Sequence, residues 1–258
     1  MITWLPGGEL WGKAGSIPLE RLWNPRSPDS LSVTDDSSHR EGDMSLSAQK
    51  RSALSAFLTG TADNSAFYTA LTAADGMREI NEQAGLRADP RYRLVRVDHR
   101  LGPAKNEFEI ALVDDIELSV AFYDKVTLVC VPGVSNRLLA RNLVWRSANR
   151  RHSLALRDIS QKVLFNYIVQ YYDIFLAADT MTDGGNFNWH RHVSRAIEKG
   201  LYAFVYHPTT QALQSIPTQG ALNDLQDLAW SDGDHEGLRA VISLSPMVSR
   251  LEKEDKPV

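Results

Sequence analysis

The sequence has one cysteine, Cys130, and no long hydrophobic run. A single cysteine excludes a disulfide framework and a multi-cysteine zinc site within the chain, and it fits a reducing compartment. Because Cys130 lies in an apolar stretch, we expect its thiol to be buried and inert. No apolar run approaches the ~20 residues of a membrane-spanning helix, and residues 1–9 lack the basic start and apolar run of a secretory leader. We therefore expect a cytoplasmic protein without membrane contact.

An excess of basic charge is also lacking. The chain has 28 lysine and arginine residues against 32 aspartate and glutamate residues, so we do not expect it to bind nucleic acid. It contains no G-x-S-x-G nucleophile elbow, no G-x-x-x-x-G-K-[S/T] phosphate loop and no G-x-G-x-x-G dinucleotide loop. These absences exclude several common enzyme classes, but the hydrophobic content of 43% is enough for a sizeable core.

Tryptophan is concentrated near the start of the chain. Residues 1–23 contain Trp4, Trp11 and Trp23, three of the six tryptophans, among glycines and prolines that interrupt any long helix. Tryptophan side chains often dominate the energetics of protein interfaces. We therefore expect residues 1–23 to form a docking arm, which binds either its own domain or a protein partner.

The next segment, residues 24–45, is rich in serine, proline and aspartate. It shows no apolar period and too little apolar surface to fold alone, so we predict a linker. Glu41-Gly42-Asp43 is also what a ribosome-binding site could encode, which leaves Met44 as an alternative start to Met1. At the other end, residues 251–258 are predicted to be a charged, solvated tail.

Residues 46–250 carry the periodic patterns of one folded domain. Apolar residues at spacings of three and four predict helices over 47–58, 63–84, 153–171, 186–199 and 222–228. Alternating or continuous apolar runs predict strands over 92–97, 107–112, 116–122, 126–131, 142–146, 172–178, 201–206 and 238–244. This order predicts an α/β (α+β) domain with a mixed, largely antiparallel central sheet flanked by helices.

A family resemblance lies in the segment 142–206, which runs as strand, arginine-rich loop, long helix, strand, helix, strand. With the upstream hairpin and helices, this order resembles the GNAT acyltransferase superfamily. In that family the loop after the first of these strands binds the acyl-CoA pyrophosphate and follows the pattern R/Q-x-x-G-x-G/A. Here the loop reads Arg150-Arg151-His152-Ser153-Leu154-Ala155, so its two ends fit and a serine replaces the first glycine.

The resemblance implies a cofactor and a set of residues that bind it. The cofactor is acetyl-CoA or another acyl-CoA, whose pyrophosphate suits arginine side chains and backbone amides at a helix start. The strand 142–146 is implied to offer backbone hydrogen bonds to the pantetheine arm. The cofactor-binding residues expected on this basis are Val144, Arg146, Arg150, Arg151, Ser153 and Ala155. A solvated face, or a patch for an acidic partner, is the alternative interpretation of the arginines.

Asp179 and His190 are the candidate catalytic residues. Asp179 follows a predicted strand, where open α/β sheets often place function, and could contact a substrate amine or act as a base; otherwise it caps a loop. His190 titrates near neutral pH and could act as a general acid or base. Because His190 and His192 point to different faces of a helix, we expect no metal site. The tyrosine that family members often use as an acid has no counterpart between Tyr172 and Tyr202.

Two functions follow from these patterns. The first is an acyl-CoA-dependent N-acyltransferase that acts on an unknown amine. The second is a non-catalytic assembly protein with a GNAT-like fold, for example a virion component of a bacteriophage, anchored in a large assembly by residues 1–23. An enzyme needs an open cleft between the strands 142–146 and 173–179, whereas an assembly protein could fill that cleft with Trp145, Tyr171 or its own arm.

Overall fold

The structure is a computed structural model that describes residues 38–101, 106–131, 134–177, 185–207, 210, 212–232 and 239–247, without the side chains of residues 38–48, 185–188 and 226–232. The predicted docking arm with Trp4, Trp11 and Trp23 lies outside the described residues, as do the predicted tail and the candidate catalytic residue Asp179. The chain divides into two compact units, residues 1–54 and residues 55–258.

The first described helix, α2, spans Ser38–Thr59 and begins before the predicted start at residue 47. It therefore includes the last part of the segment predicted to be a linker. The helix starts within a run of polar residues that includes Gly42, and this run has no apolar period. A prediction based on hydrophobic spacing has no signal to detect there.

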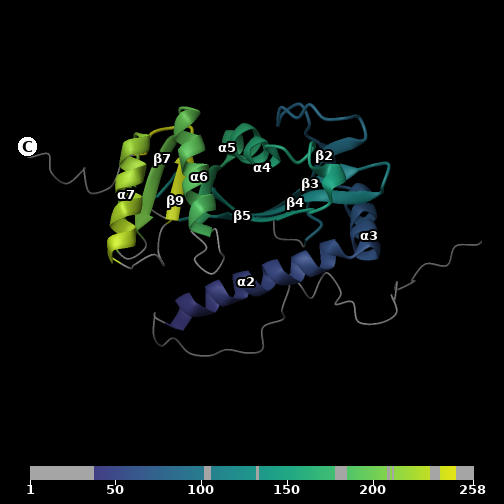
Figure 1. Cartoon of the computed structure of the whole chain (residues 1–258), viewed down its shortest axis with the longest axis horizontal. Helices are drawn as coiled ribbons and strands as arrows, with labels where there is room; N and C mark the ends of the chain where they lie inside the picture. The colour runs from purple at the N-terminus through teal and green to yellow at the C-terminus, as the bar shows by residue number, and fades with distance from the viewer. Residues whose placement is uncertain are drawn as a thin grey trace, which may run out of the picture. The chain divides into compact units, whose positions relative to one another are not determined.

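A central sheet of nine described strands organises the second unit (Figure 1). The strands are β1 (Met77–Glu79), β2 (Tyr92–Asp98), β3 (Glu107–Asp114), β4 (Ser119–Val129), β5 (Leu139–Arg146), β6 (Asp173–Ala177), β7 (Tyr202–His207), β8 (Ala212–Ser215) and β9 (Arg239–Ser243). Their order across the sheet is β1-β2-β3-β4-β5-β6-β9-β7-β8, and every neighbouring pair is antiparallel except β5 and β6. This confirms the predicted mixed, largely antiparallel α/β architecture.

Strand β4 corrects one prediction. The sequence pattern predicted two strands, over 116–122 and 126–131, separated by the polar residues Asp124 and Lys125. The structure instead has one strand of 11 residues, in which Asp124 is buried and the ammonium group of Lys125 lies 2.9 Å from the Glu107 carboxylate on β3. Polar residues at these positions therefore do not interrupt the strand, because both are accommodated within the sheet.

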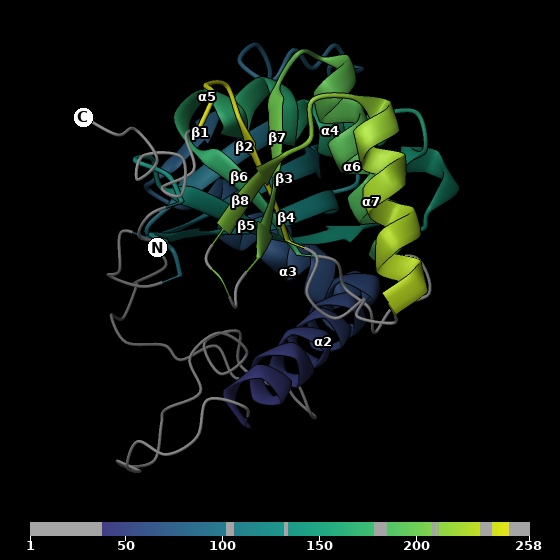
Figure 2. The ribbon, with the colours of Figure 1, turned by 90° about the vertical axis from the view of Figure 1, so that its left-hand side faces the viewer.

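Helices cover both faces of the sheet (Figures 1 and 2). On one face lie α4 (Ile159–Gln161), the π-helical segment η2 (Lys162–Ile168), α5 (Val169–Tyr171), α6 (Gly185–Glu198) and α7 (Gln219–Asp232). On the other face lies α3 (Thr61–Thr72). Its Phe67 ring packs edge-on against the Tyr123 ring of β4, with 5.1 Å between the ring centroids. Since side chains alternate along a strand, Phe122 on the same strand faces the opposite helices, where it joins the main core.

The main core lies between the sheet and the α4–η2–α5 segment. Its sheet residues include Phe108, Ile110 and Leu112 of β3, Phe122, Val126 and Leu128 of β4, Ala140 of β5 and Ile174 of β6, and its helix residues include Ile159, Val163, Leu164, Phe165, Tyr167 and Ile168. A second cluster joins α6 and α7 to β7 and β9 through Trp189, Val193, Val205, Leu222 and Ala240. The two clusters place all these helices on one side of the sheet.

Glycine at position 76 permits the turn that ends the α3 region. The predicted helix 63–84 stops at Thr72, and the chain enters β1 at Met77. Between them the Gly76 carbonyl accepts a hydrogen bond from the Asp98 amide at 3.2 Å. A Cβ atom at Gly76 would lie only 2.3 Å from the Asp98 carbonyl oxygen, so a side chain there forces the backbone to move.

This close approach predicts that Gly76→Ala destabilises the protein by about 2 kcal/mol or more, because strand β1 must shift away from β2. Gly220→Ala is the matched control, since a Cβ at that position in α7 would meet only the Thr218 hydroxyl oxygen at 3.7 Å. Urea unfolding of both variants measures the difference. Equal stability of the two variants would contradict the interpretation.

Candidate functional site

Strands β5 and β6 begin side by side and then diverge. They form parallel pairs only at Leu139 with Asp173 and at Ala140 with Ile174. Beyond this point β6 pairs with β9 on its other side, while β5 continues against β4 as far as Arg146. Within the described residues, one edge of β5 therefore has no strand partner from residue 141 onward.

The hydrogen bonds at the ends of β5 show which backbone groups face this edge. The Ser147 amide donates to the Ala121 carbonyl of β4 at 2.9 Å, and the Leu138 carbonyl accepts from the Asp173 amide at 3.1 Å. Backbone N–H and C=O groups alternate in direction along a strand. The backbone groups of odd-numbered residues of β5 therefore point to β4, and those of even-numbered residues point to β6. The N–H and C=O groups of Asn142, Val144 and Arg146 consequently face the unpaired edge.

A buried carboxyl group lies on β4, the strand that pairs with the other edge of β5. Asp124 of β4 is 1% exposed, and its Oδ2 atom accepts a hydrogen bond from the Asn142 Nδ2 atom at 2.6 Å. The other oxygen atom of each side chain, Asp124 Oδ1 and Asn142 Oδ1, is buried and has no hydrogen-bond partner. Buried polar atoms are nearly always paired, so two unpaired acceptors in one pair of side chains call for an explanation.

Burial raises the pKa of Asp124 to about 7, although hydrogen bonds from the Asn142 side chain and the Leu143 backbone act in the opposite direction. Its partners across the sheet, Ile110 and Val144, are apolar. The carboxyl group is therefore divided between its neutral and charged forms near neutral pH, which is the condition a general acid or base requires.

The helix that covers this face is irregular. The segment Lys162–Ile168 is π-helical between the short α-helical turns α4 and α5. Asp158, the residue directly before α4, adopts a left-handed conformation with φ of 57°. Widened π-helical turns are frequent at functional sites. The predicted helix start at residue 153 is thus wrong, since the helix begins at Ile159 after this strained residue.

The predicted cofactor loop follows β5 directly, and its amides are largely engaged within the loop. The His152 amide donates to the Asn149 carbonyl and the Ser153 amide to the Arg150 carbonyl, both at 3.1 Å. The Arg151 amide donates to the Asn149 side chain at 3.2 Å. These three N–H groups are not available to a phosphate in this conformation.

The predicted arginines of the loop have different environments. Arg146 donates to the Leu156 carbonyl at 2.9 Å, and Arg151 forms an ion pair with Glu117 at 2.6 Å. Arg150 is exposed and has no ion pair or hydrogen bond from its side chain within the described part of the chain. Of the remaining predicted residues, Ser153 is exposed and Ala155 is half-buried against the main core.

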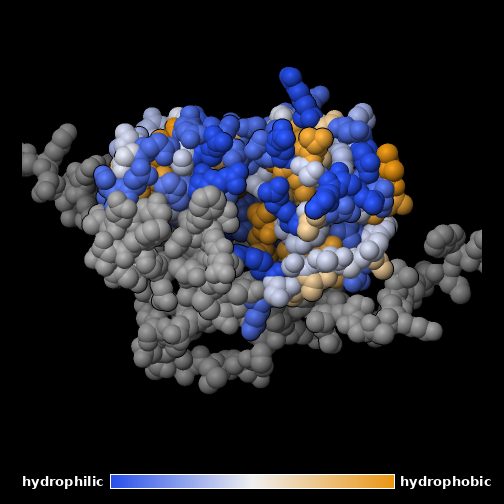
Figure 3. All heavy atoms as spheres, viewed as in Figure 1, coloured by the Kyte–Doolittle hydropathy of each residue, from blue (hydrophilic) through white to orange (hydrophobic). Residues whose placement is uncertain are grey.

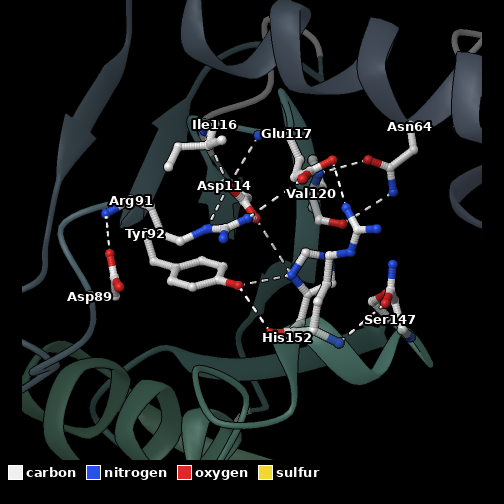
Figure 4. A network of polar contacts seen from close by, with 12 residues as sticks. Asn64, Asp89, Arg91, Tyr92, Asp114, Ile116, Glu117, Val120, Ser147 and His152 are labelled. Atoms are coloured by element: carbon white, nitrogen blue, oxygen red, sulfur yellow. Dashed lines mark hydrogen bonds and ion pairs between the residues drawn. The ribbon is translucent and has the colours of Figure 1, made fainter.

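A buried network anchors the loop to the β3–β4 hairpin (Figure 4). The Asp114 carboxylate, fully buried, accepts hydrogen bonds from Arg91 Nε at 3.1 Å and Nη2 at 2.5 Å. The Nδ1 atom of His152 lies 3.7 Å from the Asp114 Oδ2 atom and 3.1 Å from the Tyr92 hydroxyl oxygen. Sequence reasoning missed this network, because its three segments, residues 91–92, 114–117 and 152, are more than twenty residues apart along the chain.

The environment of this network favours a charged Asp114 and a neutral His152. Burial alone would raise the pKa of Asp114, but the hydrogen bonds from Arg91 and the backbone amides of Glu117 and Ile116 outweigh it, and the pKa lies below its usual value. Burial lowers the pKa of His152, which favours the neutral imidazole. None of the buried polar side-chain atoms of this network is without a hydrogen-bond partner, so we interpret it as a support for the loop.

The remaining predicted residues lie elsewhere. His190 lies half-buried on α6, and its Nε2 atom is 3.4 Å from the Asn223 Oδ1 atom of α7. Its side chain therefore contacts α7 and not β5. Tyr171 is 54% exposed and Trp145 half-buried, so neither ring is fully enclosed at the divergence of the strands. Cys130 is exposed, which corrects the expected buried thiol, because β4 ends one residue before it.

The described residues contain neither a membrane-spanning helix nor a metal-binding group. None of the described helices has the length and apolar character needed to cross a membrane. In the same part of the chain, no group of three or more histidine, cysteine, aspartate or glutamate residues is placed to hold a metal ion. No protein-family model, curated protein or solved structure matches the chain.

The raised pKa of Asp124 predicts that the protein loses stability as pH rises. The carboxyl group titrates near 4 when unfolded and at about 7 when folded, so the stabilisation from its protonated form is complete below pH 4 and is lost as pH rises through 7. At about 1.4 kcal/mol per pKa unit, the loss approaches about 4 kcal/mol.

Asp124→Asn cannot ionise and should remove this dependence, so its stability relative to wild type should increase between pH 5 and pH 8. Urea unfolding at both values measures the change, with Asp75→Asn, an exposed carboxylate, as the matched control. A difference between Asp124→Asn and wild type that stays constant with pH would be inconsistent with a raised pKa.

The anchoring network predicts unequal costs for two adjacent substitutions. Asp114→Asn should destabilise the protein by about 2–4 kcal/mol, because it leaves Arg91 without its buried counter-charge. Asp115→Asn removes the ion pair with Arg93, and the side chains of both residues are about one-third exposed. This substitution should therefore lower the free energy of unfolding by about 1 kcal/mol or less. Thermal unfolding at pH 7 compares them, and a larger cost for Asp115→Asn would refute the assignment.

Proposed function

We propose that the protein is an acyl-CoA-dependent N-acyltransferase of GNAT type. The observation that supports this most directly is the divergence of β5 and β6 after two parallel pairs. It leaves the N–H and C=O groups of Asn142, Val144 and Arg146 facing an unpaired edge. The pantetheine arm of coenzyme A is extended and carries two amide groups, so it can pair with such an edge as an added strand would.

The order of the elements supports the same proposal. The family resemblance predicted strand, loop, helix, strand, helix, strand over residues 142–206. The corresponding elements are β5, the loop with a short helical turn at Arg150–His152, the α4–η2–α5 segment, β6, α6 and β7. In this arrangement the loop follows directly from the edge that would hold the pantetheine arm.

We assign the phosphate contact to Arg150. Among the predicted cofactor-binding arginines, Arg146 is occupied by the Leu156 carbonyl and Arg151 by Glu117. Arg150 extends into solvent from the same loop and has no partner of its own within the described part of the chain. A guanidinium group in this position can bind a phosphate through paired hydrogen bonds without breaking an existing contact.

Two observations favour the alternative, a non-catalytic assembly protein. The loop amides of Arg151, His152 and Ser153 already have partners. In addition, the hairpin and the loop expose Ile116 at 69% and Leu154 at 75%, an apolar surface that a protein partner could cover. Figure 3 shows apolar residues gathered over the part of the face that carries β2, β3 and β4, while the part over α6 and α7 is mostly hydrophilic.

Isothermal calorimetry with acetyl-CoA tests the proposal. We expect micromolar affinity for wild type, roughly tenfold weaker binding for Arg150→Ala, and no change for Arg87→Ala, an exposed arginine outside the loop. Val144→Pro should also weaken binding roughly tenfold, because proline removes the N–H at the unpaired edge without removing a bond to β4.

Val144→Ala keeps that N–H and is the matched control for the proline variant. Circular dichroism and thermal unfolding establish that each variant is folded. If folded wild-type protein does not bind acetyl-CoA, the acyltransferase proposal fails and the assembly alternative is favoured.

A further inference from the structure

We infer that Asp124, held in place by Asn142, is the catalytic residue that accepts the proton of the attacking amine. The inference rests on the proposed acyltransferase function and adds the group that performs the proton transfer. It does not use the sequence-based candidates Asp179 and His190. The geometry that supports it is the pair of unpaired oxygen atoms, one on β4 and one on β5, on the sheet face that the α4–η2–α5 segment covers.

The hydrogen-bonding capacity of the pair identifies the ligand chemistry. When Asp124 is ionised, Asp124 Oδ1 and Asn142 Oδ1 are both acceptors without a donor, and the Asn142 Nδ2 atom already donates to Asp124. A ligand atom that satisfies them must therefore donate hydrogen bonds. A primary amine or ammonium group has two or three N–H donors on one atom, whereas a phosphate or an acyl oxygen offers only acceptors.

The position of the pair matches the proposed cofactor path. Asn142 is the first even-numbered residue of β5 after the last pair with β6, and its backbone faces the unpaired edge. Its side chain and that of Asp124 lie on the sheet face covered by the α4–η2–α5 segment, since Asp124 pairs with Val144 and Asn142 with Val126 across β4 and β5. An amine held by the pair would approach a thioester that lies along this edge.

The surroundings of the pair favour proton transfer over a fixed charge. The cross-strand neighbours of Asp124 are apolar, and the covering helices add Val163, Leu164, Phe165 and Ile168 to the same core. The charged and titratable groups on this face of the sheet include Arg96, which donates to Tyr167 at 3.3 Å and to Asp98. They also include Tyr92, Asp114 and His152 of the network that anchors the loop, and Arg146, which donates to the Leu156 carbonyl. None of them contributes to the pKa of Asp124, which is set by burial and by the Asn142 and Leu143 hydrogen bonds.

The proton balance of the step is complete. The ammonium form of the substrate loses one proton to the Asp124 carboxylate, and its nitrogen lone pair forms the N–C bond with the thioester carbonyl carbon. The C–S bond breaks, the coenzyme A thiolate leaves, and it takes up the second proton lost by the nitrogen. Asp124 then releases its proton to solvent. The products are the amide, coenzyme A and one proton.

The test measures thiol release from acetyl-CoA with spermidine, tyramine, an aminoglycoside and a lysine-containing peptide as acceptors, from pH 5.5 to 9. For wild type we expect kcat/KM to rise with pH through about 7, the pKa of Asp124. Asp124→Asn should lower kcat roughly 100-fold or more while its Kd for acetyl-CoA stays unchanged. Asp75→Asn is the control and should match wild type.

Asn142→Ala gives a second, independent readout. The Asn142 hydrogen bond lowers the pKa of Asp124, so its removal should shift the rising limb of the profile to higher pH. A structural role alone would lower the rate without moving the profile. This variant keeps the carboxyl group and so tests the assignment even if Asp124→Asn folds poorly.

Each other outcome overturns the inference in a distinguishable way. If wild type binds acetyl-CoA but transfers the acetyl group to none of the acceptors, or if Asp124→Asn keeps the wild-type profile, the proton-acceptor role is refuted while the proposed cofactor site stands. If Asp124→Asn weakens acetyl-CoA binding, the pair binds an amide of the pantetheine arm instead. If wild type does not bind acetyl-CoA at all, the proposed function itself fails.

Discussion

The divergence of β5 and β6 is the constraint on which the rest of the structure depends. The sheet has two halves, β1-β2-β3-β4-β5 and β6-β9-β7-β8, which are joined by only two parallel residue pairs. The joint is held by Asp173, which is 1% exposed and accepts hydrogen bonds from Ser135 and Arg137, and Arg137 also donates to the Val169 carbonyl at the end of the covering helix. Strand pairing, the helix and a buried ion pair thus fix one point, beyond which the strands separate.

The buried acids of the described chain show why Asp124 differs from the others. Glu109 is paired with Arg100, Asp114 with Arg91 and Asp173 with Arg137. In each case a guanidinium group compensates the charge that burial would otherwise disfavour. Asp124 has only the neutral Asn142 amide as a side-chain partner, so its charge is uncompensated and its pKa rises.

The sequence was sufficient to predict the fold class and most strands, because apolar alternation is a local signal. Hydrophobic spacing also located β3, β5, β6, β7 and β9 to within a few residues. It failed where polar residues are buried: the apolar pattern predicts two strands, over 116–122 and 126–131, although alternation with Phe122 and Val126 places Asp124 on the core face of one continuous strand. That conflict between polarity and position was the available signal for the site. The unpaired edge and the Tyr92–His152 contact depend on pairing between distant segments, which no local pattern encodes.

The energetic cost of Asp124 bears on the choice between the two functions. A buried carboxyl group with two unsatisfied acceptors nearby is destabilising at neutral pH, whereas an apolar side chain of similar size at this position would pack against Ile110 and Val144 without that cost. An assembly protein that needed only a rigid fold would gain stability from such a replacement. The proposed acyltransferase would use a group with this ionisation behaviour to accept the proton of the amine. Local destabilisation of this kind is characteristic of functional sites, and it favours the enzyme over the assembly protein.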